Sequence, residues 1–342
     1  MTVLLLGFDN GIARVSLNGR ARAEWTLQGV HVSALAVDPL RPERAYAATM
    51  GEGLLLSDDG GLTFKPAGSL KGARVWSLEV SRSDRSDGLG AVYAGTEPSA
   101  LHRSEDGGRT FHELESVRDI PGRAEWSFPP APDTHHVHSI ALSVADPQIV
   151  IFGVELGGVY RSDDRGATWA QVPADPDPHT LRTHPDAPER IYEGGGASYV
   201  QSDDSGLTWH RDLNGIPDSV RYFYSLAVDS HDPDNVLISA ARDPFSGHGV
   251  LPGQTPWSTV YRRRGRRAWE EVTDGLPPRE GTEMGALVAD PRAHGSFFYI
   301  TTRPRGLYRS LDGGESWSAL GGCWPEHATR RGGPIATAAQ ER

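Results

Sequence analysis

Short apolar runs recur along the whole chain, and each is bounded by residues that favour turns. The segments 32–37, 44–49 and 53–56 are typical, since the first ends at Asp38 and Pro39 and the third begins after Gly53. Runs of this length between Gly, Pro, Asn and Asp are typical of β-strands. Three such strands and a fourth beyond the next turn predict a four-stranded antiparallel sheet, which is the blade of a β-propeller.

A polar motif separates the third and fourth strands of most of these units. It reads Ser-x-Asp-x-Gly-x-Thr/Ser-aromatic, and we call its five copies the box turns; they lie at 57–64, 104–111, 162–169, 202–209 and 310–317. A spacing of about 40 to 58 residues is in the range of propeller repeats. Asp and Ser side chains bind the N–H groups of their own turn, and Gly accepts a positive φ. We therefore expect the box turns to be structural; the alternative is that each binds calcium or a sugar.

The repeats predict six complete blades, at about 31–70, 74–116, 136–172, 177–213, 222–276 and 283–322. The fifth blade keeps the aromatic residue Trp269 but carries a basic run, 262–267, in place of its box turn. We expect this run to be a solvated turn; an acidic partner at that place is the alternative.

The two ends of the chain supply a further blade. Segments 3–7, 11–16 and 23–27 predict three strands without an inner one, and 334–339 has the pattern of an inner strand. Pairing the two ends would close the ring and leave no open sheet edge. The predicted fold class is therefore all-β: a seven-bladed β-propeller of four-stranded antiparallel blades, one domain over 1–342, closed by a composite blade of residues 1–27 and 334–340.

Composition and charge narrow the function. The net charge of −11 argues against nucleic acid as a partner, because phosphate recognition needs a basic surface. The single cysteine, Cys323, excludes an internal disulfide and a Cys-based zinc site. The chain has no apolar run of about 18 residues and does not begin like a signal peptide. We expect a cytoplasmic protein with no membrane partner.

The box turns and the blade pattern resemble the BNR or Asp-box repeat superfamily, which includes sialidases, sortilin-type receptors and photosystem II assembly factors. Segments 126–137 and 179–181 are similar to those of a bacterial group labelled sialidase-like or glycosyl hydrolase. Sialidase activity would require a Phe/Tyr-Arg-Ile-Pro motif, whose Arg helps to clamp the substrate carboxylate, and a tyrosine nucleophile paired with Glu. The chain lacks this motif, and Tyr222 or Tyr224 could serve as the nucleophile. The resemblance therefore implies the fold rather than sialidase activity.

Ionisable residues gather where the inner strands are expected to begin. With the inner strands aligned on a central apolar residue, the positions four before it are His31, Arg74, His136, Asp177, Tyr222 and Glu283. The positions two before it are Ser33, Trp76, His138, His179, Tyr224 and Gly285. The loops between second and third strands add Asp9, Glu52, Glu97, Glu155, Glu193 and Arg303 on the same face. Because side chains alternate along a strand, both aligned sets are predicted to surround one mouth of the axial channel.

Two long insertions, 115–135 and 242–258, fall on the same face. Long loops on a rigid scaffold often carry function, and aromatic side chains beside a polar ring suit a small-molecule pocket. The candidate substrate-binding residues are Arg74, Trp126, Arg242, His248 and Trp257.

Several interpretations of the ring stay open. In the first, one divalent metal ion is held by histidine imidazoles and by Glu97, Glu155 or Glu193. The candidate histidines are His31, His136, His138 and His179. The protein would then be a metal-assisted hydrolase or lyase that acts on a small molecule. In the second, carboxylates act as an acid–base pair on a sugar, and the candidates are Glu155, Glu193, Asp177 and Glu283. The candidate catalytic residues are Glu155, Glu193, Tyr222 and Glu283. In the others, the ring lines a wet channel, or the propeller is a scaffold that presents one face to a protein partner.

Overall fold

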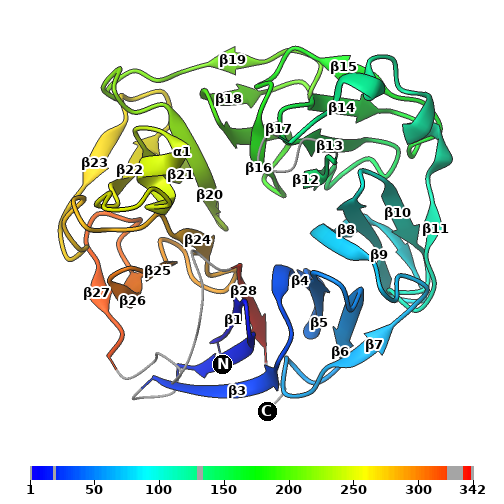
Figure 1. Ribbon diagram of the computed structural model, residues 1–342, viewed down its shortest axis with the longest axis horizontal. Coiled ribbons are helices and arrows are strands. Elements are labelled where there is room, and N and C mark those ends of the chain that lie inside the picture. Colours follow the sequence, from blue (N-terminus) through cyan, green and yellow to red (C-terminus); the bar gives the residue numbers. More distant parts are fainter. Residues whose placement is uncertain (1, 18–20, 129–133, 322–333, 340–342) are drawn as a thin grey trace.

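The computed structural model describes residues 2–17, 21–128, 134–321 and 334–339. Seven four-stranded antiparallel sheets surround a central axis (Figure 1), which confirms the predicted seven-bladed propeller. None of the helices in the described ranges is long and apolar enough to span a membrane.

The blades follow one another in chain order, each from its inner to its outer strand. Blades 1 to 3 comprise β4 (Val32–Asp38), β5 (Arg41–Thr49), β6 (Leu54–Ser57) and β7 (Lys65–Ala67); β8 (Arg74–Ser86), β9 (Leu89–Glu97), β10 (Leu101–Ser104) and β11 (His112–Glu113); and β12 (Val137–Leu142), β13 (Val150–Val154), β14 (Gly158–Ser162) and β15 (Ala170–Val172). Blades 4 to 6 comprise β16 (Pro178–His184), β17 (Ala187–Gly195), β18 (Tyr199–Ser202) and β19 (His210–Arg211); β20 (Tyr222–Asp229), β21 (Asp232–Ala241), β22 (Ser258–Arg264) and β23 (Glu270–Val272); and β24 (Ala286–Ala289), β25 (Phe297–Thr302), β26 (Arg305–Ser310) and β27 (Ser318–Ala319).

The composite blade joins the two ends of the chain, as predicted. Its strands, again from the inner one, are β28 (Ile335–Ala339), β1 (Thr2–Phe8), β2 (Gly11–Ser16) and β3 (Arg22–Gln28). The strands β28 and β1 are antiparallel, with Leu6 opposite Ile335, and the Gly7 N–H donates to the Pro334 carbonyl at 2.9 Å.

The composite blade is packed on both of its faces. Leu4 and Leu6 lie in a cluster with Phe298 of blade 6, whereas Val3 and Leu5 lie in a cluster with residues of blade 1. This division follows from the alternation of side chains along a strand. One strand therefore links the first and last complete blades, which closes the ring.

The box turns form the hydrogen bonds that the sequence predicts. In the first copy, Asp59 Oδ1 accepts from the N–H groups of Leu62 and Thr63, both at 2.9 Å, and Ser57 Oγ accepts from the Gly61 N–H at 2.8 Å. Gly61 has a φ of +80°, a conformation that strongly favours glycine. The remaining copies repeat this pattern, as the bonds of Asp106, Asp164, Asp204 and Asp312 show.

The basic run that stands in place of a box turn in blade 5 was predicted to be a solvated turn, but its first three arginines lie at the end of β22 and pair with acidic neighbours. Arg263 forms an ion pair with Asp212 at 3.1 Å, and Arg264 forms one with Glu315 at 3.2 Å. Cζ of Arg263 also lies over two aromatic rings, 4.7 Å from the centroid of Tyr199 and 5.1 Å from that of Trp269. The run therefore takes part in packing blade 5 against blades 4 and 6.

Three short helices lie in the two long insertions. The 3₁₀ helices η1 (Glu115–Asp119) and η2 (Arg123–Glu125) belong to the first insertion, and α1 (Pro244–His248) belongs to the second. Asp243 caps α1, since its side chain accepts from the Ser246 N–H at 2.8 Å. The helix is tied to blade 6 by a bond from the Met284 N–H to the Gly247 carbonyl at 2.8 Å.

Candidate functional site

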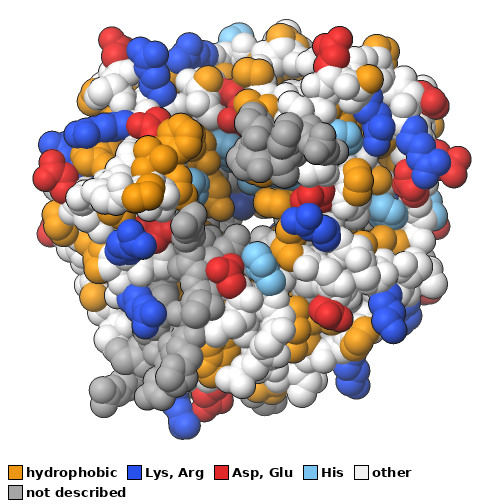
Figure 2. Space-filling view, in the orientation of Figure 1, with side chains coloured by type: hydrophobic (Ala, Val, Ile, Leu, Met, Phe, Trp, Pro, Cys, Tyr) orange, Lys and Arg blue, Asp and Glu red, His pale blue; other side chains and the backbone are white. Residues whose placement is uncertain are grey.

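A hollow of about 500 Å³ follows the propeller axis and is lined by all seven inner strands. Figure 2 shows its opening at the centre of the face that carries α1. Hydrophobic side chains gather over α1 beside this opening, where Phe245 and Leu251 are about half exposed. A cavity of this size is typical of small-molecule sites.

Five inner strands carry a β-bulge near the mouth of the hollow. On β12, Val137 pairs with Val154 and Ser139 with Gly153, so His138 is the extra residue. The extra residues of the other four strands are Ser33, Trp76, His179 and Tyr224. A bulge re-aims the extra side chain, and all five line the hollow. The predicted ring at this level is therefore present, but bulges produce it rather than simple alternation.

Three histidines and one glutamate meet at the side of this mouth. Glu155, in the turn between β13 and β14, has its Oε2 atom 2.7 Å from Nε2 of His136 and 3.9 Å from Nε2 of His138. Its Oε1 atom lies 4.0 Å from Nε2 of His179, which belongs to the next blade. We call His136, His138, Glu155, Asp177 and His179 the His–Glu cluster; Asp177 Oδ1 lies 3.5 Å from Nε2 of His179.

The backbone determines which nitrogen of two of these imidazoles faces the cluster. Nδ1 of His138 lies 2.9 Å from the His179 carbonyl, and Nδ1 of His179 lies 3.2 Å from the Phe223 carbonyl. A carbonyl only accepts, so Nδ1 carries the proton in both rings. In the neutral imidazole Nε2 then keeps its lone pair, and both Nε2 atoms face Glu155. This arrangement is common among metal-binding histidines, whose second N–H donates to a carbonyl or carboxylate.

Aromatic packing holds His136 in place. Its ring stacks on Trp76 of blade 2, with 3.8 Å between centroids and 14° between planes, and Phe128 meets it edge-on at 5.0 Å. The His136 side chain is fully buried. Blades 2, 3 and 4 therefore all contribute to the cluster or to its packing.

The charges within the cluster are strongly coupled. Burial opposes ionisation of Glu155, but the hydrogen bond from His136 and the charges of the three histidines lower its pKa to about 2. Burial lowers the pKa of His138 to about 4. Burial also disfavours the charged form of His179, yet its contact with Asp177 and the charge of Glu155 raise its pKa. Glu155 is therefore a carboxylate at neutral pH, beside a neutral His138.

Two overlapping sets of donor atoms, which share Glu155, each suit a divalent cation. Single ligand atoms of His136, His138 and Glu155 lie within 4.8 Å of one another, and so do those of Glu155, Asp177 and His179. Nε2 of His179 is buried and has no hydrogen-bond partner among the described residues. Imidazole nitrogens and carboxylates together suit zinc, iron, nickel, copper or manganese, and the two carboxylates match a charge of +2.

Other predicted metal ligands lie elsewhere. His31 lines the hollow but contacts Asp9 on the composite blade, with 3.3 Å between Nε2 and Oδ1. Glu97 accepts from Trp76 Nε1 at 2.6 Å and pairs with Arg74 at 2.8 Å. His31 therefore lines the hollow, whereas the side chain of Glu97 is buried, and both lie in contacts separate from the His–Glu cluster.

Two predicted catalytic glutamates are buried. Glu193 was expected in a loop but lies within β17, fully buried, where its Oε2 accepts from the Asp175 N–H at 3.3 Å. Burial and the charge of Asp175 raise the pKa of Glu193 well above its usual value. Glu283 is 2% exposed and accepts from Thr302 Oγ1 at 3.0 Å. Neither residue is among those that line the hollow.

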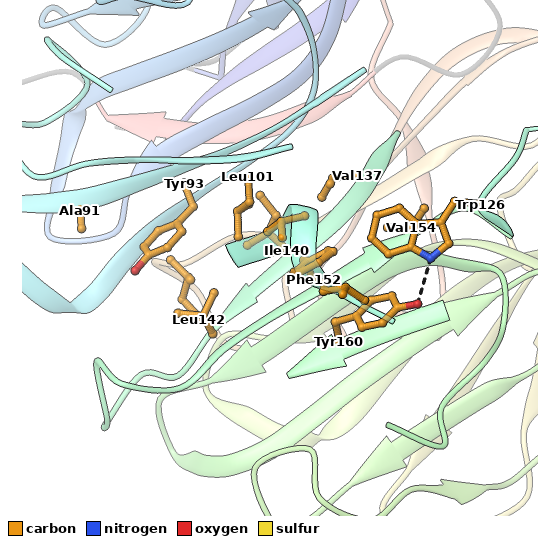
Figure 3. Close-up of a cluster of buried hydrophobic side chains, with 13 residues drawn as sticks. Ala91, Tyr93, Leu101, Trp126, Val137, Ile140, Leu142, Phe152, Val154 and Tyr160 are labelled. Carbon is orange, nitrogen blue, oxygen red and sulfur yellow. Dashed lines mark hydrogen bonds between the residues drawn. The ribbon is translucent and has the colours of Figure 1, made fainter. Parts of the chain in front are cut away.

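The expected aromatic lid is instead part of the core. Trp126 is 6% exposed and donates Nε1–H to the Tyr160 hydroxyl at 2.9 Å, packed among the residues of blades 2 and 3 that Figure 3 shows. Trp257 is equally buried, and the guanidinium of Arg242 lies 4.7 Å from its ring. Large indole rings cover more apolar area inside a blade interface than above a channel. Trp126, Arg242 and Trp257 therefore contribute to packing.

Tyr222 and His248 lie together beside the cluster. The Tyr222 hydroxyl is 3.2 Å from Nε2 of His248 on α1, and the Tyr222 ring meets His179 edge-on at 4.8 Å. Burial raises the pKa of Tyr222 well above its usual value, so its hydroxyl is neutral. The second insertion thus reaches the cluster through His248.

The sequence analysis did not identify Asp175 or Asp177 as part of the metal site. Asp177 was placed at the mouth but not among the metal ligands, and Asp175 was not singled out. Asp175 Oδ1 accepts from the Asp177 N–H at 2.9 Å, and Asp175 Oδ2 accepts from Ser198 Oγ at 2.7 Å. The spacing Asp175-x-Asp177-x-His179, directly before and at the start of an inner strand, is the signal that could have identified them.

Known proteins resemble this chain in part. No protein-family model matches it. A xyloglucanase from Paenibacillus sp is 26% identical over 333 residues, covering 78% of this chain and 31% of that protein. The chain spans about a third or less of the length of the curated relatives it matches, all of which are xyloglucanases.

Solved structures share the fold. The Niastella koreensis GH74 enzyme superposes with a TM-score of 0.63 at 17% identity, covering 92% of this chain and 51% of that one. A structure of YCF48 bound to D1 peptide superposes with a TM-score of 0.53 at 16% identity, covering 84% and 82%. An enzyme and a peptide-bound protein thus share this propeller, so the fold alone does not select between catalysis and scaffolding.

Proposed function

We propose that the protein is a metal-assisted hydrolase that acts on a carbohydrate at the axial mouth, with one divalent cation held by the His–Glu cluster. His136, His138 and His179 would supply imidazole nitrogens, and Glu155 a carboxylate oxygen. A cation bound there would polarise a substrate oxygen or lower the pKa of a bound water. Asp177 would hold His179 and complete the charge balance.

One observation carries this proposal: Nε2 of His179 is buried, lacks a hydrogen-bond partner among the described residues, and faces the carboxylates of Glu155 and Asp177. The contact with Asp177 and the charge of Glu155 raise the pKa of His179, which favours a proton on the Nε2 that faces these carboxylates. A bound cation would take the place of this proton and offset the repulsion between the two carboxylates.

The carbohydrate class rests on the relatives. The curated proteins with detectable sequence similarity are xyloglucanases. The hollow accommodates a small ligand, and the apolar side chains over α1 provide a face on which a sugar ring can pack. The identity of the sugar is not part of this proposal.

A second candidate is a metal-free glycoside hydrolase that uses two carboxylates, as the similarity to xyloglucanases suggests. Such an enzyme needs one carboxyl that donates a proton and one that is ionised. Glu155 suits only the ionised role, because its pKa is about 2. Burial raises the pKa of Glu193, but its side chain is fully buried and does not line the hollow. Glu155 and Glu193 therefore do not form such a pair, and the metal is our first candidate.

Hydrolysis of xyloglucan oligosaccharides and of nitrophenyl glycosides tests the proposal. The protein would be stripped with a chelator, dialysed and reloaded with zinc or manganese. We expect hydrolysis that is lost on stripping, restored by the metal and absent in E155Q. Activity that survives stripping would favour the carboxylate mechanism, and no activity in any form would favour the scaffold.

A further inference from the structure

A second polar level lies deeper in the axial hollow. On three of the bulged strands, the residue three positions beyond the bulge also lines this cavity; these residues are Ala36, Glu79 and Arg182. Two of the three are charged, although apolar residues would fill this level. Glu79 comes from β8 of blade 2 and Arg182 from β16 of blade 4, with blade 3 between them.

Glu79 and Arg182 influence each other through charge but do not touch. Each alters the pKa of the other, yet no ion pair within 4.0 Å joins them or links either to another described residue. Arg182 donates from Nη1 to the Leu181 carbonyl at 2.8 Å, which occupies one of its five N–H donors. Arg182 is exposed and is among the residues that line the hollow.

The charges of Arg182 and Glu79 lie in surroundings that disfavour ionisation. Arg182 is exposed to the hollow, but the surrounding protein keeps it from bulk water. This burial lowers the pKa of Arg182, and burial raises the pKa of Glu79. A charge in such surroundings is stabilised by a partner of opposite sign. By contrast, Arg85 of β8, which does not line the hollow, pairs with Asp38 at 3.0 Å.

We propose that Arg182 binds a carboxylate group of the ligand in the hollow, with hydroxyl groups of the ligand toward Glu79, so that the site selects an acidic sugar over a neutral one. This inference rests on the proposed function for its carbohydrate class. A guanidinium and a carboxylate match in charge and in their paired hydrogen bonds. A doubly charged phosphate fits less well, because Glu79 lies near and only one guanidinium faces the level.

The distances allow one ligand to reach both levels. His179 and Arg182 are three residues apart on β16, which is about 10 Å along a strand. The long Arg182 side chain shortens this gap, and both residues line one continuous hollow. A six-carbon sugar acid can therefore lie with its carboxylate at Arg182 and its other end toward the His–Glu cluster.

Binding of three closely matched sugars tests the inference. Glucuronate, glucose and glucosamine have similar shapes and carry a negative, zero and positive charge. Calorimetric titration of metal-loaded and chelator-stripped protein should show glucuronate binding at least tenfold tighter than the other two. Arg182→Met should abolish this preference, whereas Arg82→Met, which removes another basic residue that lines the hollow, should keep it.

The outcomes separate this inference from the proposed function. Equal binding of the three sugars, a preference for glucosamine, a preference unchanged in Arg182→Met, or no binding of glucuronate would each overturn the role of Arg182. Metal titration of the same variant reads the cluster independently, and Arg182→Met should bind metal as the native protein does. Arg182→Lys keeps the charge, and we expect it to retain part of the preference if Arg182→Met folds poorly.

Discussion

The Nε2 atom of His136 lies 2.7 Å from Oε2 of Glu155, at the open end of one hairpin in blade 3. The two residues are 19 positions apart, and strand pairing of β12 with β13 brings them together. Trp76 of blade 2 stacks on this histidine, and His179 of blade 4 completes the cluster. Three consecutive blades thus converge on one carboxylate.

Removing a cluster histidine should abolish metal binding with little loss of stability. His138→Ala and His179→Ala should each weaken zinc affinity by at least about 100-fold, because even outer-shell partners of a metal contribute 10–100-fold. His31→Ala is the matched control, since His31 lines the same hollow but contacts Asp9. Calorimetric titration with zinc measures all three. Native affinity in both cluster variants would contradict the assignment.

A box-turn variant should lose stability but not ligand binding. Asp204 accepts from the N–H groups of Leu207 and Thr208 at 3.1 and 2.8 Å. Asp204→Ala should therefore lower the free energy of unfolding by about 1–2 kcal/mol. The exposed Asp218 provides the control, since Asp218→Ala should change stability little. If folded Asp204→Ala lost metal or ligand binding, the box turns would be sites rather than structural turns.

Acid should destabilise the propeller through the box turns. Hydrogen bonds to their carboxylates outweigh burial and lower the pKa of Asp106, Asp204 and Asp312 to about 2. In the unfolded chain an Asp titrates near 3.9. The folded state therefore favours the ionised form of these Asp side chains more than the unfolded chain does. The resulting contribution to the free energy of unfolding is present above about pH 4 and is lost as the pH falls toward 2.

Denaturant unfolding between pH 5 and pH 2.5 measures this effect. Asp204→Asn is neutral throughout, so it should show a smaller loss of stability over that range than the native protein. An identical pH dependence in the two proteins would contradict the role of the Asp204 charge.

Deleting the last strand should open the ring. Truncation after residue 333 removes β28, whose residues Ala336 and Ala338 are buried and whose backbone pairs with β1. The edge of β1 and the faces of two blades would then meet water, so we expect a sharply lower melting temperature. Thermal unfolding followed by circular dichroism provides the measurement. A truncated protein that melts at the native temperature would contradict closure by β28.

Much of the fold could be predicted because its signals are local and repeated. Each box turn makes its bonds within a few residues, and the missing inner strand at one end matched the unassigned strand at the other. Aligning the repeats also brought His138 and His179 to one level, since equivalent residues of neighbouring blades lie at similar heights.

The remainder of the site depends on contacts that the pattern does not contain. The bulges at His138 and His179 arise from pairing with the second strand, so alternation alone does not reveal them. Trp126 was predicted to cover the channel, but its indole finds Tyr160 inside the blade interface. Glu193 was predicted to lie in a loop, but β17 continues for two residues beyond it, to Gly195, and its side chain is fully buried.

Anomalous diffraction from crystals of the zinc-loaded protein tests the central claim most directly. The account predicts one anomalous peak per chain, about 2.0–2.2 Å from imidazole nitrogens of His136, His138 and His179 and from a carboxylate oxygen of Glu155. It also predicts that this peak vanishes in Glu155→Gln crystals grown with the same zinc. No peak at the cluster, or a zinc ion bound only elsewhere on the propeller, would contradict the metal site.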